Sequence, residues 1–195
     1  MRPGLTWDDR WMRTRSKITI GLGAANLAVG SAMLPSELRM RRAAGRGIIA
    51  LEFAGSERRA RALMRAWGRD GRGAARRLQW LDFAYLATYA PFLGLVTLAA
   101  GERLDRRGRH RLAAIAPALA QAQLAAGAFD AIENAALLGV LAGARGDGLP
   151  RLAFGCAGVK FALLAAGWLL LPAAVGPASH GPASSGPTRP PKRAA

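Results

Sequence analysis

The sequence predicts an all-α integral membrane protein, a bundle of about four transmembrane helices with an amphipathic interfacial helix in the first loop. Apolar residues form long blocks without any charged side chain, the clearest being residues 18–36, 83–101 and 112–129. Each block approaches the ~20 residues that a helix needs to cross ~30 Å of hydrocarbon. Arginines lie between the blocks and supply most of the net charge of +16. A buried, soluble helical protein is the alternative, but a soluble helix of this length normally has a charged face.

The chain has few residues suited to metal or redox chemistry. Cys156 is the only cysteine, so neither an intrachain disulfide nor a thiolate zinc site can form. His110 and His180 lie outside the apolar blocks and are not at metal-ligand spacing. P-loop, HExxH and GxSxG motifs are absent from the sequence. We therefore expect no metal and no cofactor. The preference for Arg over Lys, with abundant Ala and Gly, indicates a GC-rich bacterial genome.

A basic leader, residues 1–17, precedes the first predicted span, residues 18–34, which Pro35 is expected to end. A secretory signal peptide is the alternative, because an apolar block after a basic leader is typical of one. The leader is long and contains Asp8 and Asp9, which is unusual for a signal peptide. The other blocks require membrane insertion in any case. We therefore interpret residues 18–34 as the first transmembrane helix.

The long basic connection that follows contains a predicted amphipathic helix over residues 56–69. Ser56 suits the N-cap, and apolar residues repeat at helical spacing as far as Trp67. Four arginines fall on the opposite face: Arg58, Arg61, Arg65 and Arg69. One interpretation places Trp67 and these arginines against lipid headgroups at the membrane interface. In the other, the apolar face packs on the protein and the arginines are solvated.

Three further spans are predicted, over residues 80–100, 118–142 and 152–171. Pro91 is expected to kink the second, and Pro117 places the start of the third near Ala118. The membrane domain therefore covers residues 18–175. Residues 176–195 repeat Gly, Pro and Ser, and we expect a disordered tail.

Polar and ionisable residues inside the predicted spans are the candidates for a ligand-binding or proton-coupling site, because such groups are costly in hydrocarbon. At ~1.5 Å per residue, one polar residue of each span lies roughly 12–13 Å below the same end of the bundle. The four residues at this level are Asn26, Tyr89, Glu133 and Lys160. The remaining candidates are Asp82, Tyr85, Asp130 and Asn134.

The third span concentrates this polarity, because Asp130, Glu133 and Asn134 share one face of the helix. Glu133 and Lys160 are about equally far from the loop that joins their helices, so we expect them to form a desolvated ion pair. Asp130 would then be the carboxylate without a cation. These groups either join the helices as interhelical hydrogen bonds, or form a site that needs a ligand or a proton.

Three segments, with a helix ending in Trp67 after the first, carry a resemblance to known sequences: GIIALEFAG, LDFAYLATY and FDAIEN, within residues 47–138. The combination, with its FDxxEN-type motif, resembles uncharacterised small bacterial multi-pass membrane proteins. The resemblance implies a multi-pass membrane protein, and it implies no activity, cofactor or catalytic residue.

The leading functional hypothesis is a cell-membrane protein that binds or transports a small molecule or lipid. The alternatives are a structural or accessory subunit and, third, an intramembrane acid–base enzyme. The expected partners are the bilayer and its anionic headgroups, with a second copy of the chain left open and nucleic acid excluded. Lys and Arg number 13 on the side of the termini and 14 on the other side. Long loops count for less in the positive-inside rule, which favours cytoplasmic termini, whereas the arginine helix favours the reverse.

Overall fold

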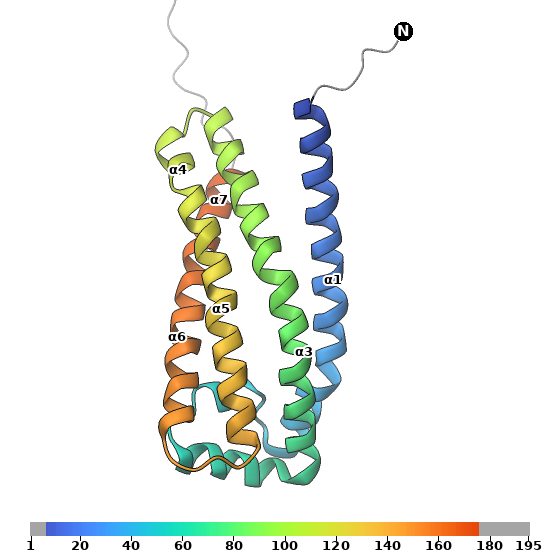
Figure 1. The fold of residues 1–195 in the computed structure, drawn as a ribbon, viewed down its shortest axis with the longest axis vertical. Coiled ribbons are helices and arrows are strands. Elements are labelled where there is room, and N and C mark those ends of the chain that lie inside the picture. Colours follow the sequence, from blue (N-terminus) through green and yellow to red (C-terminus); the bar gives the residue numbers. More distant parts are fainter. Residues whose placement is uncertain (1–6, 176–195) are drawn as a thin grey trace, which may run out of the picture.

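The computed structural model describes residues 7–175, and this part of the chain contains helices, turns and no β-strand. Four long helices run side by side with alternating direction (Figure 1). They are α1 (Trp7–Ala44), α3 (Glu57–Arg106), α5 (Ala116–Leu141) and α6 (Gly148–Trp168). All four are long and apolar enough to cross a membrane, α5 together with the preceding α4 and α6 with the residues after it. The predicted tail, residues 176–195, lies outside the described residues.

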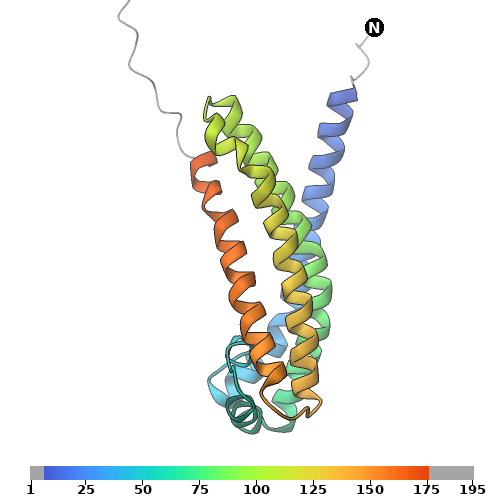
Figure 2. The same ribbon diagram turned by 60° about the vertical axis from the view of Figure 1, so that its left-hand side comes forward.

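The short helices lie at the two ends of the long ones. Helix α2 (Ile49–Glu52) belongs to the connection between α1 and α3, whereas α4 (His110–Ala114) and α7 (Leu170–Val175) lie at the opposite end (Figure 1). The long helices pack in sequence order, α1 on α3, α3 on α5 and α5 on α6. The halves of α1 and α6 that lie away from α2 stand apart in both ribbon views (Figure 2). The arrangement is therefore open between its first and last helices.

Helices α1 and α6 have boundaries that differ from the prediction. Helix α1 continues through Pro35 to Ala44, so Pro35 does not end it. A proline removes one backbone hydrogen bond, and a long helix packed along a neighbour tolerates that loss. Helix α6 begins at Gly148, before the predicted start at Leu152, and ends at Trp168, after which α7 contains Pro172.

The other boundaries follow the sequence signals more closely. Helix α5 begins at Ala116 and has a proline in its first turn, where the missing N–H is not needed. Ser56 caps α3, because its hydroxyl accepts a hydrogen bond from the Arg59 amide at 3.4 Å. After residue 68, helix α3 keeps helical geometry through Pro91 to Arg106.

The amphipathic segment and the second predicted span form one interrupted helix. Within α3 only Gly68 departs from helical geometry, with φ 65° and ψ −163°. This region of backbone space is open to glycine and closed to other residues. The segment before Gly68 lies across the end of the long helices, and the segment after it runs along them (Figure 1). Gly68 therefore makes the turn that separates the two.

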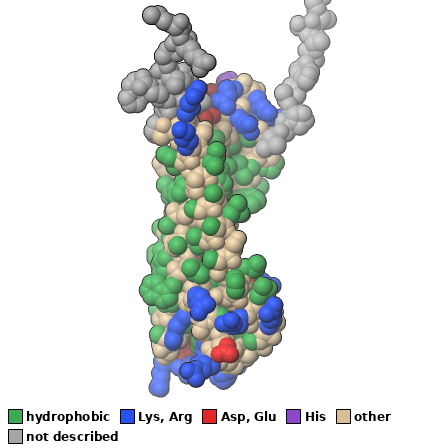
Figure 3. All heavy atoms as spheres, turned by 90° about the vertical axis from the view of Figure 1, so that its right-hand side faces the viewer, with side chains coloured by type: hydrophobic (Ala, Val, Ile, Leu, Met, Phe, Trp, Pro, Cys, Tyr) green, Lys and Arg blue, Asp and Glu red, His purple; other side chains and the backbone are tan. Residues whose placement is uncertain are grey.

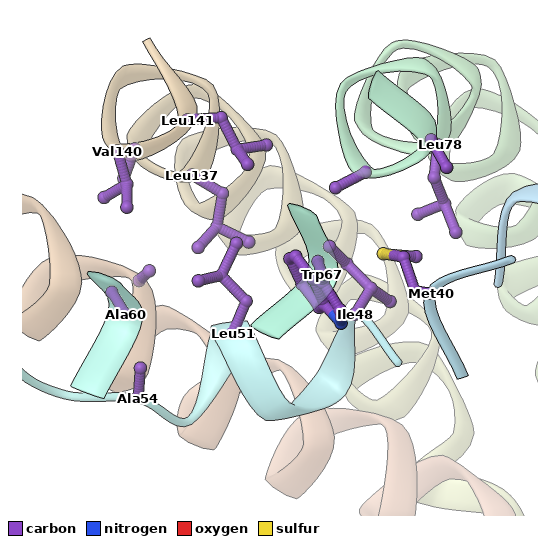
Figure 4. Close-up of a cluster of buried hydrophobic side chains, with 14 residues drawn as sticks. Met40, Ile48, Leu51, Ala54, Ala60, Trp67, Leu78, Leu137, Val140 and Leu141 are labelled. Atoms are coloured by element: carbon purple, nitrogen blue, oxygen red, sulfur yellow. The ribbon is translucent and has the colours of Figure 1, made fainter. Parts of the chain in front are cut away.

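The end near α2 contains the largest apolar core (Figure 4). Trp67 is 2% exposed and packs among Met40, Ile48 and Leu51, and its indole N–H donates to the Arg46 carbonyl at 2.8 Å. Ala60 is buried in the same core. The apolar face of the segment thus packs on the protein, as in the second of the two interpretations. Trp67 does not lie against headgroups, because protein atoms already cover its ring.

The surface divides into a middle zone and two charged ends. Figure 3 shows a middle zone of apolar side chains and backbone, with Lys and Arg gathered at both ends of the molecule. Exposed apolar side chains include Ile20, Leu27 and Leu169, each more than 70% accessible. Contiguous exposed apolar surface of this kind is rare on soluble monomers and is what a lipid-facing surface requires.

Candidate functional site

Lys160 on α6 lies among three buried carboxylates. Together they form the acid–lysine cluster, which consists of Glu52, Asp130, Glu133 and Lys160. The Lys160 ammonium lies 2.9 Å from Asp130 Oδ1 and 2.9 Å from Glu133 Oε2. Glu133 is fully buried, and its contact with Lys160 lacks hydrogen-bond angles, so it is an ion pair by distance. One cation therefore lies between two carboxylates of α5. The predicted contact between Glu133 and Lys160 is present in the structure.

The prediction that Asp130 lacks a cation is wrong. Asp130 accepts hydrogen bonds from the Lys160 ammonium and, at 2.8 Å, from the Tyr89 hydroxyl of α3. Asp130 and Glu133 are three residues apart on one helical face, so a single long lysine side chain reaches both. Asp130 is thus the best-satisfied acid of the cluster.

Glu52 completes the cluster from outside the long helices. The residue is 7% exposed, and its Oε2 lies 3.8 Å from the Lys160 ammonium, too far for a hydrogen bond. Among the described residues this oxygen has no N–H donor within hydrogen-bond geometry, and the acid Glu133 is the side chain that hydrogen-bonds with Glu52. Burial raises the pKa of the Glu52 carboxyl above its usual value, and the nearby Lys160 ammonium works in the opposite direction.

Asp82 forms a second acidic position on α3. Its Oδ2 accepts a hydrogen bond from Asn134 Nδ2 at 2.8 Å, and the residue remains partly exposed. Asn134 is 1% exposed and projects from the same face of α5 as Glu133. The predicted polar face of α5 thus contacts α3 at two levels, through Asp82 and through Tyr89.

An open cavity of about 440 Å³ lies beside the acid–lysine cluster and Asp82. It is lined by residues of α1, α3, α5 and α6 and by the segment around α2, and we call it the lateral cavity. Its polar lining consists of Asn26, Glu52, Asp82, Tyr85, Tyr89, Asp130 and Lys160. Glu133 and Asn134 lie behind this lining. The volume falls within the range of small-molecule pockets, ~300–1,000 Å³.

Asn26 and Tyr85 belong to the cavity wall and make no contact with Lys160. Asn26 donates to the Thr88 hydroxyl at 3.3 Å, which joins α1 to α3. The Tyr85 ring lies 5.4 Å from the Tyr89 ring, centroid to centroid. Of the four residues predicted at one level, Glu133 contacts Lys160 and Tyr89 contacts Asp130, the other partner of Lys160. Asn26 instead bonds to Thr88.

The arginine candidates lie at the end of the molecule, away from the acid–lysine cluster. Arg58, Arg65 and Arg69 are exposed, and Arg61 pairs with Glu57 at 2.7 Å. Arg58, Arg65 and Arg69 are therefore accessible to solvent or headgroups.

Sequence reasoning missed Glu52. A signal was present, because GIIALEFAG is an apolar run with a single carboxylate in its middle. An isolated charge in such a run predicts burial beside a cation. Glu52 lies in a connection, however, and counting depth along predicted spans takes no account of connections.

Comparison with known proteins yields no relative: the chain matches no protein-family model, no curated protein and no solved structure. Its function is therefore inferred from the cluster and the lateral cavity.

Proposed function

We propose that this chain is a multi-pass integral membrane protein of the bacterial cell membrane that binds or transports a small molecule or lipid in its lateral cavity. The four long apolar helices and the apolar middle zone support membrane insertion. The expectation that both termini are cytoplasmic stays a prediction.

One observation carries the binding proposal: Glu52 and Asp82 line the lateral cavity without a cation in hydrogen-bond contact. Side chains that only hold helices together satisfy one another, as Asp130 does with Tyr89 and Lys160. A carboxylate left facing a cavity instead requires a ligand or a proton. Binding therefore explains the arrangement better than an accessory subunit without a site.

The basic end supports a second contact, with the membrane surface. Arg58, Arg65 and Arg69 are exposed on the segment that crosses the end of the long helices. Basic residues beside the ends of spans attract anionic headgroups, at about 1 kcal/mol per charge. We propose that this segment faces anionic lipid through its arginines while its apolar side packs on the protein.

The binding proposal is tested by filling the cavity. Ile49→Trp puts a large ring at the cavity wall, at a residue that is 50% exposed and tolerates bulk. Leu27→Trp is the matched control, because Leu27 is 73% exposed and does not line the cavity. Native mass spectrometry after incubation with total bacterial lipid and small-molecule extracts should show an adduct on the wild type and the control only. Equal adducts on all three proteins, or none on the wild type, would contradict the proposal.

A further inference from the structure

The lateral cavity has more acid than base. Glu52, Asp82 and Asp130 line it, and Lys160 is the one basic side chain in its lining. The Lys160 ammonium is already held between Asp130 and Glu133. Two of the lining carboxylates, Glu52 and Asp82, therefore remain available to bind a ligand.

Glu52 is an independent observation that points to a ligand with a hydrogen-bond donor. Its Oε2 is buried and has no N–H donor within hydrogen-bond geometry among the described residues, its hydrogen-bonding neighbour being the acid Glu133, and the residue lines the cavity. Leaving a buried acceptor unpaired costs free energy that a bound donor would recover. The occupant therefore carries an N–H or O–H donor, and a positively charged donor pairs best with a carboxylate.

The rest of the cavity wall is apolar and aromatic. Tyr85, Phe92, Phe161 and Trp168 line it together with aliphatic side chains. Aromatic faces attract organic cations and also accommodate apolar rings. Within the described part of the chain, no group of three or more His, Cys, Asp or Glu side chains is arranged to hold a metal ion. The wall thus suits a cation with an apolar body.

Resting on the proposed function, we propose that the ligand of the lateral cavity is an organic ammonium ion with an apolar or aromatic body, its N–H groups donated to Glu52 and its charge shared with Asp82. The body lies against the aromatic wall formed by α3 and α6.

The overall charge of the protein works against this preference. The chain carries a net charge of +16, so non-specific attraction favours anions. A preference for cations therefore has to come from local carboxylates. This separates cavity binding from adsorption to the basic ends of the molecule.

The test uses three probes with one ring system and three charges. These are 1-naphthylmethylammonium, 1-naphthalenemethanol and 1-naphthoate, titrated by calorimetry into the full-length protein in maltoside micelles, with empty micelles as the blank. The ammonium should bind at least about ten-fold more tightly than the alcohol, because a charge-assisted hydrogen bond is stronger than a neutral one. The naphthoate should bind most weakly.

Substitutions test whether Glu52 and Asp82 cause the preference for the ammonium probe. Glu52→Gln and Asp82→Asn should each lower ammonium affinity by about ten-fold and leave alcohol affinity unchanged. Asp70→Asn is the matched control, since Asp70 is an exposed acid away from the cavity lining and its loss should change neither affinity. Ile49→Trp should abolish binding of both probes.

The source of the ammonium is distinguished by competition with lipid. If an aminolipid is the natural occupant, phosphatidylethanolamine added to the micelles displaces the ammonium probe and phosphatidylglycerol does not. If the occupant is a free amine, neither lipid displaces it. Displacement by phosphatidylethanolamine alone supports an aminolipid, displacement by neither lipid excludes both and leaves a free amine, and displacement by phosphatidylglycerol would contradict the ammonium class.

The results that would overturn the ammonium inference differ from the result that would contradict the proposed function. Equal affinity for the ammonium and the alcohol, both lost in Ile49→Trp, would overturn the ammonium inference and leave the cavity as a binding site. Tighter binding of naphthoate, unaffected by Glu52→Gln, would also overturn it. Absence of binding by all three probes would contradict the proposed function as well.

Discussion

Lys160 Nζ lies 2.9 Å from Glu133 Oε2, and neither side chain is more than 7% exposed. The two residues come from adjacent helices, α5 and α6. A buried pair of this kind contributes little net stability when intact, because desolvation opposes the Coulomb attraction. Breaking it is costly, since the remaining charge loses its partner. The pair therefore fixes how α5 and α6 are positioned relative to each other.

Replacing Lys160 by Met should destabilise the protein by about 3–5 kcal/mol, because Glu133 and Asp130 both lose their cation. The measurement is unfolding in mixed maltoside–dodecyl sulfate micelles, followed by circular dichroism. Glu133→Gln combined with Lys160→Met should recover part of the loss, with a coupling of about 1–3 kcal/mol. Recovery is partial because Asp130 remains unpaired. Additive effects of the two substitutions would contradict the contact.

The Tyr89 hydroxyl donates to Asp130 at 2.8 Å, and Tyr89→Phe removes only this donor. We expect a loss of about 1–3 kcal/mol, because the acceptor is buried and charged. Tyr85→Phe is the control: its hydroxyl donates to no described residue, and the change should stay within about 0.5 kcal/mol. The same unfolding assay measures both. Equal losses would contradict the assigned role of the Tyr89 hydroxyl, because both substitutions keep the ring and only Tyr89 donates to Asp130.

Much of the cluster could be predicted from the sequence because helical geometry is regular. Counting depth along apolar blocks brought Tyr89, Glu133 and Lys160 to one level, and the structure places all three around Asp130 or in contact with it. The error about Asp130 arose because the prediction let Lys160 pair with only one of the two acids and left Asp130 without a cation. A lysine side chain is long enough to reach two acids one turn apart, which depth alone does not show.

Glu52 could not be placed in the same way. Its position depends on how the connection between α1 and α3 folds back, and this connection is fixed by contacts between distant residues. The Glu37 carboxylate accepts from the Ile48 amide at 3.0 Å, and Trp67 donates to the Arg46 carbonyl at 2.8 Å. Such tertiary contacts leave no periodic pattern in a sequence. The continuation of α1 through Pro35 was missed for a related reason, since packing along α3 outweighs the local preference of proline.

Gly68 makes the turn between the two parts of α3, and its backbone conformation is closed to alanine. Gly68→Ala should therefore destabilise the protein by about 1–3 kcal/mol. Gly73→Ala is the matched control, because Gly73 is exposed and helical and a new methyl group would meet no atom within 4 Å. It should stabilise the helix by up to ~1 kcal/mol. Thermal unfolding of both variants measures the difference, and a neutral Gly68→Ala would show that the turn does not need glycine.

Glu52 should make stability depend on pH. Its carboxyl is buried and faces Lys160 of α6, Asp130 and Glu133 of α5, and Glu37 of α1. Burial is the largest influence and raises the pKa of Glu52 above its ordinary value of 4.5. The folded protein therefore holds this proton more tightly than the unfolded chain. The resulting stability is complete below the ordinary pKa and is lost as the pH rises through the raised pKa.

Glu52→Gln keeps the shape of the protonated acid and removes its titration. As the pH rises from ~5 to ~8, the unfolding free energy of the wild type should fall relative to that of Glu52→Gln. The other carboxylates are present in both proteins, so the difference between them reports the titration of Glu52 together with its coupling to its acidic neighbours. Thermal unfolding of the two proteins in maltoside micelles across this range measures it, with Asp70→Asn as an exposed control whose difference from the wild type should stay constant. If the difference instead moves in favour of the wild type, Glu52 acts as an ionised partner of Lys160 throughout, and burial does not dominate its titration.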